Sequence, residues 1–225
     1  MNDSGKPNDG KKLRDGERVN GGGKERNGEQ LQRFSKLLRI ITLPQFMAAV
    51  MLSVLRFSKG CFPGASFYVS LFCLTVFPML SYAVWRVVPS LYKKGRKTQR
   101  AIAVAFSFAG YAAGTVYCFV SGAGAVEKTV FLTYLLSGLV IALSGALVKV
   151  RISGHACGLS GPLGILVWKV GPWFIAGYAI LALVFWSSIR LRRHSLRELI
   201  LGTALPLLLL MLIIGVACVS GVPLR

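Results

Sequence analysis

Acidic side chains are nearly absent from most of this 225-residue chain. Six of its eight carboxylates lie in the first 29 residues, and Glu127 and Glu198 are the two that follow. Sites built from clustered carboxylates, such as EF-hand sites, two-metal hydrolases and paired-acid glycosidases, are therefore excluded. Histidine is equally scarce, with two residues, and the five cysteines show no CxxC spacing. We therefore expect no metal, no cofactor and no disulfide framework.

Apolar residues are abundant, at 54% of the chain, and the mean hydropathy is +0.59. A soluble domain of this size has fewer apolar and more charged residues, so the composition indicates a protein of the lipid bilayer. The net charge of +19 fits this class, because Lys and Arg collect in cytoplasmic loops of membrane proteins. The aromatic residues lie inside apolar segments, so nucleic acid is not expected as a partner. The sequence carries no signal for an oligomeric state.

The N-terminal segment differs from the rest of the chain. Residues 1–36 contain nine basic and six acidic side chains, many Gly and Asn, and almost no large apolar groups. Such a segment cannot bury enough surface to offset the entropy of ordering, so we predict a disordered, basic and polar cytoplasmic tail. It has no apolar stretch near its start, so it is not a cleavable signal peptide. Residues 37–225 are predicted to form the transmembrane domain.

Apolar runs separated by short breaks predict an all-α, polytopic transmembrane bundle of about six to seven spans. The number of spans is given as six to seven because the first apolar run is short and contains Pro44. The stretch from Ala156 to Ile189 is too long for one crossing, and Gly171-Pro172 divides it. The predicted helices cover 40–56, 66–88, 101–121, 129–148, 156–170, 173–189 and 199–220.

Basic residues indicate which breaks share one side of the membrane. Five lie in 93–100, two in 149–151 and four in 190–197. With seven crossings, these three breaks fall on the same side as the basic tail. The opposite side has few basic residues, so the charge distribution places the first group in the cytoplasm.

Both histidines lie in these basic breaks, directly before predicted helices. His155 precedes the helix at 156, and His194 precedes the last span. Two histidines, several arginines and two helix N-termini are thus expected to converge on one membrane face. Helix N-termini and guanidinium groups both favour phosphate oxygens, so the pattern predicts a phosphate site without a metal.

Glu198 follows His194 by four residues and is the one carboxylate in the last 97 residues. At this spacing on a helix, a carboxylate can hold an imidazole in one tautomer. A histidine held in this way can act as a nucleophile or as an acid or base near neutral pH.

Two segments resemble signatures of the type 2 phosphatidic acid phosphatase superfamily. Its second signature is written Pro-Ser-Gly-His, and its third Ser-Arg-x5-His-x3-Asp, commonly with a glycine four residues later. Ser153, Gly154 and His155 match the second signature. Ser187, His194 and Gly202 match the third, with Glu198 at the Asp position. The resemblance covers roughly residues 129–215.

The resemblance implies a helical membrane hydrolase that needs no metal. His194 would attack phosphorus and form a phosphohistidine, Glu198 would orient it, and His155 would protonate the leaving alcohol. Ser153 and the Gly154 backbone would cradle phosphate oxygens. The substrate would be a lipid phosphate or diphosphate, of the phosphatidate or polyprenyl diphosphate type.

The chain departs from the family pattern at three places. The first signature, Lys-x6-Arg-Pro, is absent, Ile152 replaces a proline, and Ser188 stands at the position of a phosphate-binding arginine. Arg151 and Arg190 are the nearest substitutes, with Arg192 a weaker one. Divergent bacterial members resemble this chain in having a basic residue shortly before Ser-x-His, which implies a bacterial plasma membrane. Family members usually place the site on the extracytoplasmic face, whereas the charge distribution here favours the cytoplasm.

Other interpretations of the same residues stay open. Ser195 and Glu198 also form a capping box at the start of a helix, His155 alone would be an interfacial histidine, and Glu127 beside Lys128 is expected to be a solvated loop charge. A catalytically silent relative that binds anionic lipid headgroups is one alternative function. A small membrane transporter or scaffold is another.

The predicted topology can be tested by thiol labelling. A single cysteine introduced beside Lys94 in a cysteine-free background is expected to be shielded from membrane-impermeant reagents in intact cells, because the basic break at 93–100 is cytoplasmic. Ready labelling without permeabilisation would place this break, and the site with it, outside the cell.

Overall fold

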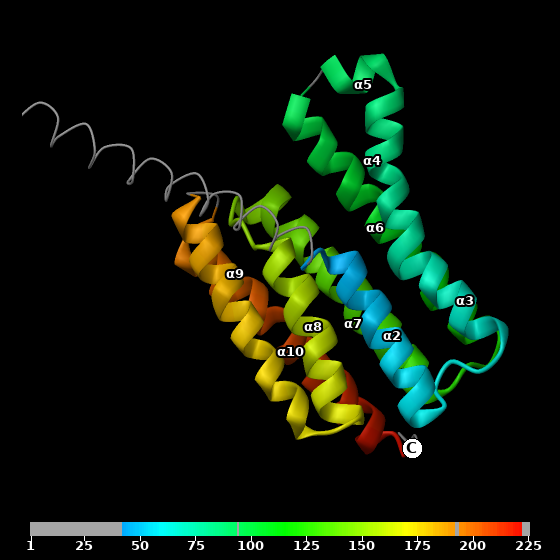
Figure 1. Cartoon of the computed structure of the whole chain (residues 1–225). Coiled ribbons are helices and arrows are strands. Elements are labelled where there is room, and N and C mark those ends of the chain that lie inside the picture. Colours follow the sequence, from blue (N-terminus) through cyan, green and yellow to red (C-terminus); the bar gives the residue numbers. More distant parts are fainter. Residues whose placement is uncertain (1–41, 94, 192–193, 222–225) are drawn as a thin grey trace, which may run out of the picture. The chain divides into compact units, whose positions relative to one another are not determined.

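The structure of the protein is a computed structural model that describes residues 42–93, 95–191 and 194–221. These ranges contain helices and the turns between them, and no strand occurs among them. The α-helices are α2 (Pro44–Lys59), α3 (Ala65–Leu71), α4 (Phe77–Val87), α5 (Pro89–Lys93), α6 (Gly95–Val120), α7 (Ala125–Leu143), α8 (Gly154–Lys169), α9 (Tyr178–Arg190) and α10 (Leu196–Val219) (Figure 1). The π-helical turns η1 (Phe72–Val76) and η2 (Ser144–Val148) and the 3-10 helix η3 (Pro172–Gly177) adjoin them. The predicted tail at 1–36, Lys94 and Arg192 lie outside the described residues.

Five continuous helical segments are long and apolar enough to cross a membrane. They are Ala65–Val87, Lys97–Val120, Ala125–Val148, Pro172–Arg190 and Leu196–Val219. The all-α class is thus confirmed, and the five segments indicate an integral membrane protein. The other two predicted spans correspond to α2 and α8, which have 16 residues each. The total of six to seven spans stays a prediction.

Proline and glycine set the helix ends, and α2 runs from Pro44 to Lys59 where the sequence predicts a helix over 40–56. Pro44 occupies the first turn of α2, where its missing N–H is not needed. Gly60 ends the same helix in the left-handed conformation, with its N–H donated to the carbonyl of Arg56. The predicted break at Gly171-Pro172 is confirmed, because α8 ends at Lys169 and η3 begins at Pro172.

Helix α8 lies at the centre of the packing and contacts α2, α7, α9 and α10 (Figure 1). Ten of its sixteen residues are buried. Glycines allow the neighbours to approach closely: a Cβ at Gly158 would lie 2.4 Å from Cβ of Pro44, and one at Gly164 would lie 2.5 Å from Cδ2 of Leu207. A residue at the start of α8 is therefore held by several helices at once.

Glu127 is not the solvated loop charge that the sequence suggests. It lies in the first turn of α7 and is 3% exposed. Its carboxylate accepts the backbone N–H of Phe62 at 2.8 Å and the hydroxyl of Ser66 at 2.7 Å. Phe62 is fully buried with φ of 59°, a left-handed conformation uncommon for a side-chain-bearing residue. Glu127 therefore ties the α2–α3 turn to the start of α7.

This tie leads to a stability prediction. Glu127→Ala would leave the buried Phe62 N–H without its acceptor, so the free energy of unfolding is expected to fall by roughly 2–4 kcal/mol. Glu127→Gln keeps an acceptor oxygen and should lose less. Thermal unfolding of the detergent-solubilised variants measures both, and equal midpoints for wild type and Glu127→Ala would contradict the structural role.

Candidate active site

The second signature forms the beginning of α8. Lys149 ends the preceding helical turn in the left-handed conformation, with φ of 55°, and a short extended segment follows. Ser153 is the N-cap of α8, and its hydroxyl accepts the N–H of Ala156 at 3.3 Å. Ser153 is fully buried, whereas Gly154 is exposed. The serine of this signature therefore caps the helix, and the glycine faces the surroundings.

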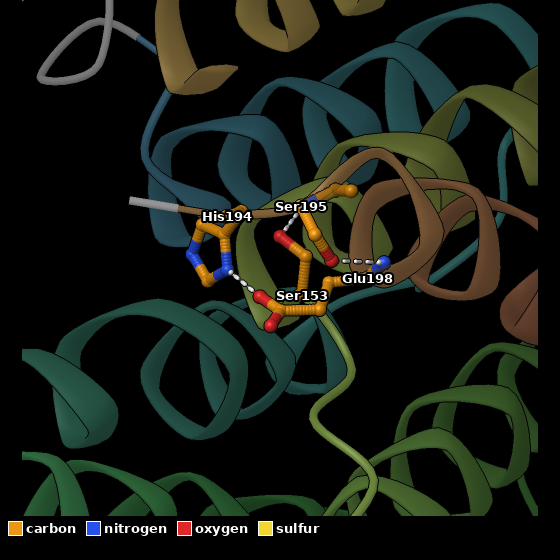
Figure 2. Close-up of polar contacts among 5 residues, drawn as sticks. Ser153, His194, Ser195 and Glu198 are labelled. Atoms are coloured by element: carbon orange, nitrogen blue, oxygen red, sulfur yellow. Dashed lines mark hydrogen bonds and ion pairs between the residues drawn. The ribbon is translucent and has the colours of Figure 1, made fainter. Parts of the chain in front are cut away.

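The third signature forms the beginning of α10. Ser195 is its N-cap and accepts the N–H of Glu198 at 3.3 Å, so the serine half of the predicted capping box is present. The Glu198 carboxylate is directed at His194, with 2.6 Å between Oε2 and Nδ1 (Figure 2). The two side chains are 26% and 21% exposed. The cap and the histidine–carboxylate pair thus coexist, because the serine hydroxyl and the Glu198 side chain serve different partners.

The two helix starts lie against each other. The N–H of Ser153 donates to the backbone carbonyl of Glu198 at 3.0 Å. Gly202, one turn further along α10, lies so close that a Cβ there would be 2.4 Å from the carbonyl oxygen of Ser153. Further along α8 and α10, the Ser160 hydroxyl donates to the carbonyl of Thr203 at 2.9 Å. The structure therefore brings the two signatures together at one end of α8 and α10.

His155 lies in the first turn of α8, two residues after the cap, and is half-buried. Its Nε2 is 3.0 Å from the hydroxyl oxygen of Thr42, just before α2. Sequence reasoning missed Thr42, since nothing in its local pattern connects it with a histidine 113 residues away. The contact adds α2 to the elements that surround the predicted site.

The predicted phosphate-binding arginines lie at the surface. Arg151 is exposed, in the segment before Ser153. Arg190 is exposed at the end of α9, and its guanidinium carbon lies 5.8 Å from the centre of the Trp186 ring. Ser188, at the position of the signature arginine, is buried at 3% exposure. Position 188 therefore faces the interior, whereas Arg190 faces outward over an aromatic ring.

The geometry defines the chemistry available to His194. A carboxylate can accept but not donate a hydrogen bond, so an ionised Glu198 requires the proton of a neutral His194 to be on Nδ1. The lone pair is then on Nε2, which is the atom able to attack an electrophile. The N-terminal ends of α8 and α10 add positive partial charge at the same place, which favours an anionic ligand.

Comparison of the chain with protein-family models, with curated proteins and with solved structures finds no match.

The contact at Gly202 can be tested by a single methyl group. Gly202→Ala is expected to lower the free energy of unfolding by roughly 1–3 kcal/mol, because its Cβ would overlap the backbone of Ser153. Gly215→Ala in the same helix is the matched control, since no atom lies within 4 Å of its Cβ. Thermal unfolding in detergent compares the two, and equal midpoints would show that α8 and α10 are not in contact here.

Proposed function

We propose that the chain is an integral membrane phosphatase that hydrolyses a phosphomonoester or diphosphate on a lipid alcohol. The main support is the 2.6 Å contact between Nδ1 of His194 and Oε2 of Glu198, beside the start of α8 that carries His155. A carboxylate-held imidazole, a second imidazole and two helix N-termini are the groups that phosphate transfer through histidine requires.

In the first step, Nε2 of His194 attacks phosphorus and the bond from phosphorus to the leaving oxygen breaks. His155 gives a proton to that oxygen, and the lipid alcohol departs. Glu198 stabilises the positive charge that develops on the His194 ring. The product is a phosphohistidine with its phosphorus on Nε2.

In the second step, water attacks the phosphohistidine. His155, now neutral, takes a proton from the water, and the bond between phosphorus and Nε2 breaks. Inorganic phosphate leaves, and both histidines return to their starting states. No redox change and no metal ion enter either step.

Phosphate oxygens would be bound by the exposed backbone N–H of Gly154 and by Arg151, with Arg190 able to contribute after leaving Trp186. The hydroxyl of Ser153 caps α8 and its N–H binds Glu198, so its role would be mainly to shape this cradle. Substrates of the phosphatidate and polyprenyl diphosphate types both fit, because their headgroups are anionic and their tails stay in the bilayer.

The serine at position 188 favours a second candidate function, the binding of lipid headgroups without turnover. A buried serine stands where the family has an arginine, so one positive group for the transition state is missing. A silent relative would still bind anionic lipid headgroups through Arg151 and the helix ends. Arg151→Ala would weaken phosphate binding in both cases, whereas turnover separates them.

Phosphate release tests the proposal. The purified, detergent-solubilised protein is expected to release inorganic phosphate from members of a panel of lipid phosphates and diphosphates with a metal chelator present. His194→Ala should abolish release, because no nucleophile remains. Glu198→Gln should reduce it by about 10²- to 10⁴-fold, because the tautomer and the ring charge are no longer held.

Glu127→Gln is the matched carboxylate control, because Glu127 binds Phe62 and Ser66 and is outside the candidate site. It should retain activity. Equal release by wild type and His194→Ala would eliminate the histidine mechanism. No release from any substrate, by folded wild-type protein, would favour headgroup binding.

A further inference from the structure

The segment just before α2 supplies a polar group to the candidate site. The hydroxyl oxygen of Thr42 lies 3.0 Å from Nε2 of His155. Thr42 is 3% exposed, so this contact is largely shielded from water that would compete for the same groups. Neither part of the proposed phosphate chemistry assigns a role to this threonine.

The position of Thr42 is fixed by backbone packing. Leu43 is extended, as is usual before a proline, and Pro44 begins α2. Pro44 packs directly on Gly158, three residues after His155, where a Cβ would be 2.4 Å from the proline Cβ. The hydroxyl is thus attached to a rigid helix start that lies against the same helix as the histidine.

We infer that Thr42 is a positioning residue for His155, an inference that rests on the phosphatase function proposed above. An imidazole can rotate about its side-chain bonds and can hold its proton on either ring nitrogen. A buried hydroxyl at Nε2 restricts the plane of the ring. Because a hydroxyl can both donate and accept, it fits either neutral tautomer, and its effect is on the orientation of the ring. Glu198 thus contacts a ring nitrogen of His194, and Thr42 contacts a ring nitrogen of His155.

This role has a specific kinetic consequence. A positioned acid matters most when the leaving oxygen is a poor leaving group that must be protonated as it departs. An alkyl lipid phosphate has such a leaving group, whereas a nitrophenyl phosphate does not. Loss of a positioning hydroxyl should therefore slow the first substrate far more than the second.

The contact itself can be tested without any turnover. The chain has two histidines, so ¹⁵N-histidine labelling gives two imidazole signal sets, which His194→Ala assigns. At a pH at which imidazole is neutral, Nε2 of His155 in the detergent-solubilised protein should show the chemical shift of a hydrogen-bonded nitrogen. Thr42→Val should change the Nε2 shift, because the hydroxyl partner is lost, and Thr42→Ser should restore it. Identical His155 spectra for wild type and Thr42→Val would overturn the inference.

Turnover then tests the catalytic consequence. Thr42→Val is expected to slow hydrolysis of an alkyl lipid phosphate by about tenfold and to leave nitrophenyl phosphate hydrolysis nearly unchanged, with recovery in Thr42→Ser. Thr133→Val is the matched control, because Thr133 is buried and donates to the carbonyl of Thr129 within α7. Thr42→Ala replaces Thr42→Val if the latter does not fold.

The outcomes separate the two proposals. Equal slowing of both substrates by Thr42→Val would mean a structural role and would overturn the inference while leaving the phosphatase proposal intact. Absence of turnover in the wild type would refute the phosphatase proposal and with it a positioning role in catalysis. The histidine spectra would then still decide whether Thr42 holds His155.

Discussion

The start of α10 lies against the start of α8 because one backbone hydrogen bond and one glycine leave almost no space between them. The Ser153 N–H donates to the Glu198 carbonyl. Gly202 lies so close to the Ser153 carbonyl that no side chain would fit at position 202. Two sequence motifs about forty residues apart thereby become one local structure. The spacing of His194, Glu198 and His155 depends on this contact, because each is within a helical turn of it.

The start of α7 is held in a different way. There a buried carboxylate, Glu127, satisfies a backbone N–H and a hydroxyl of the turn between α2 and α3. The two described carboxylates of the chain thus have unlike tasks: Glu127 binds main chain in the interior, and Glu198 binds an imidazole at a partly exposed helix start. Burial and partner, not residue type, distinguish them.

Helix positions follow from the sequence because apolar runs and proline or glycine breaks are local signals. The break at Gly171-Pro172 is an example, whereas α2 ends at Lys59 and not at the predicted residue 56. The pairing of His194 with Glu198 was also accessible, since a spacing of four on a helix is local. Two other contacts could not be predicted, because tertiary packing brings together residues far apart in the sequence. Phe62 contacts Glu127 across 65 residues, and Thr42 contacts His155 across 113 residues. The outward direction of Arg190 likewise depends on the orientation of α9 in the bundle.

In the proposed phosphatase, the length of α8 would affect which phosphates reach its N-terminal end. Sixteen residues give a helix of about 24 Å, shorter than the hydrocarbon layer of about 30 Å. If α8 crosses the bilayer as predicted, with Lys169 at one interface, its start would lie below the level of the headgroups of the other leaflet. A water-soluble phosphate ester would have to leave bulk solvent to descend to this depth. A lipid phosphate in the same leaflet would already be tethered there by its tail, so depth alone would discriminate between the two.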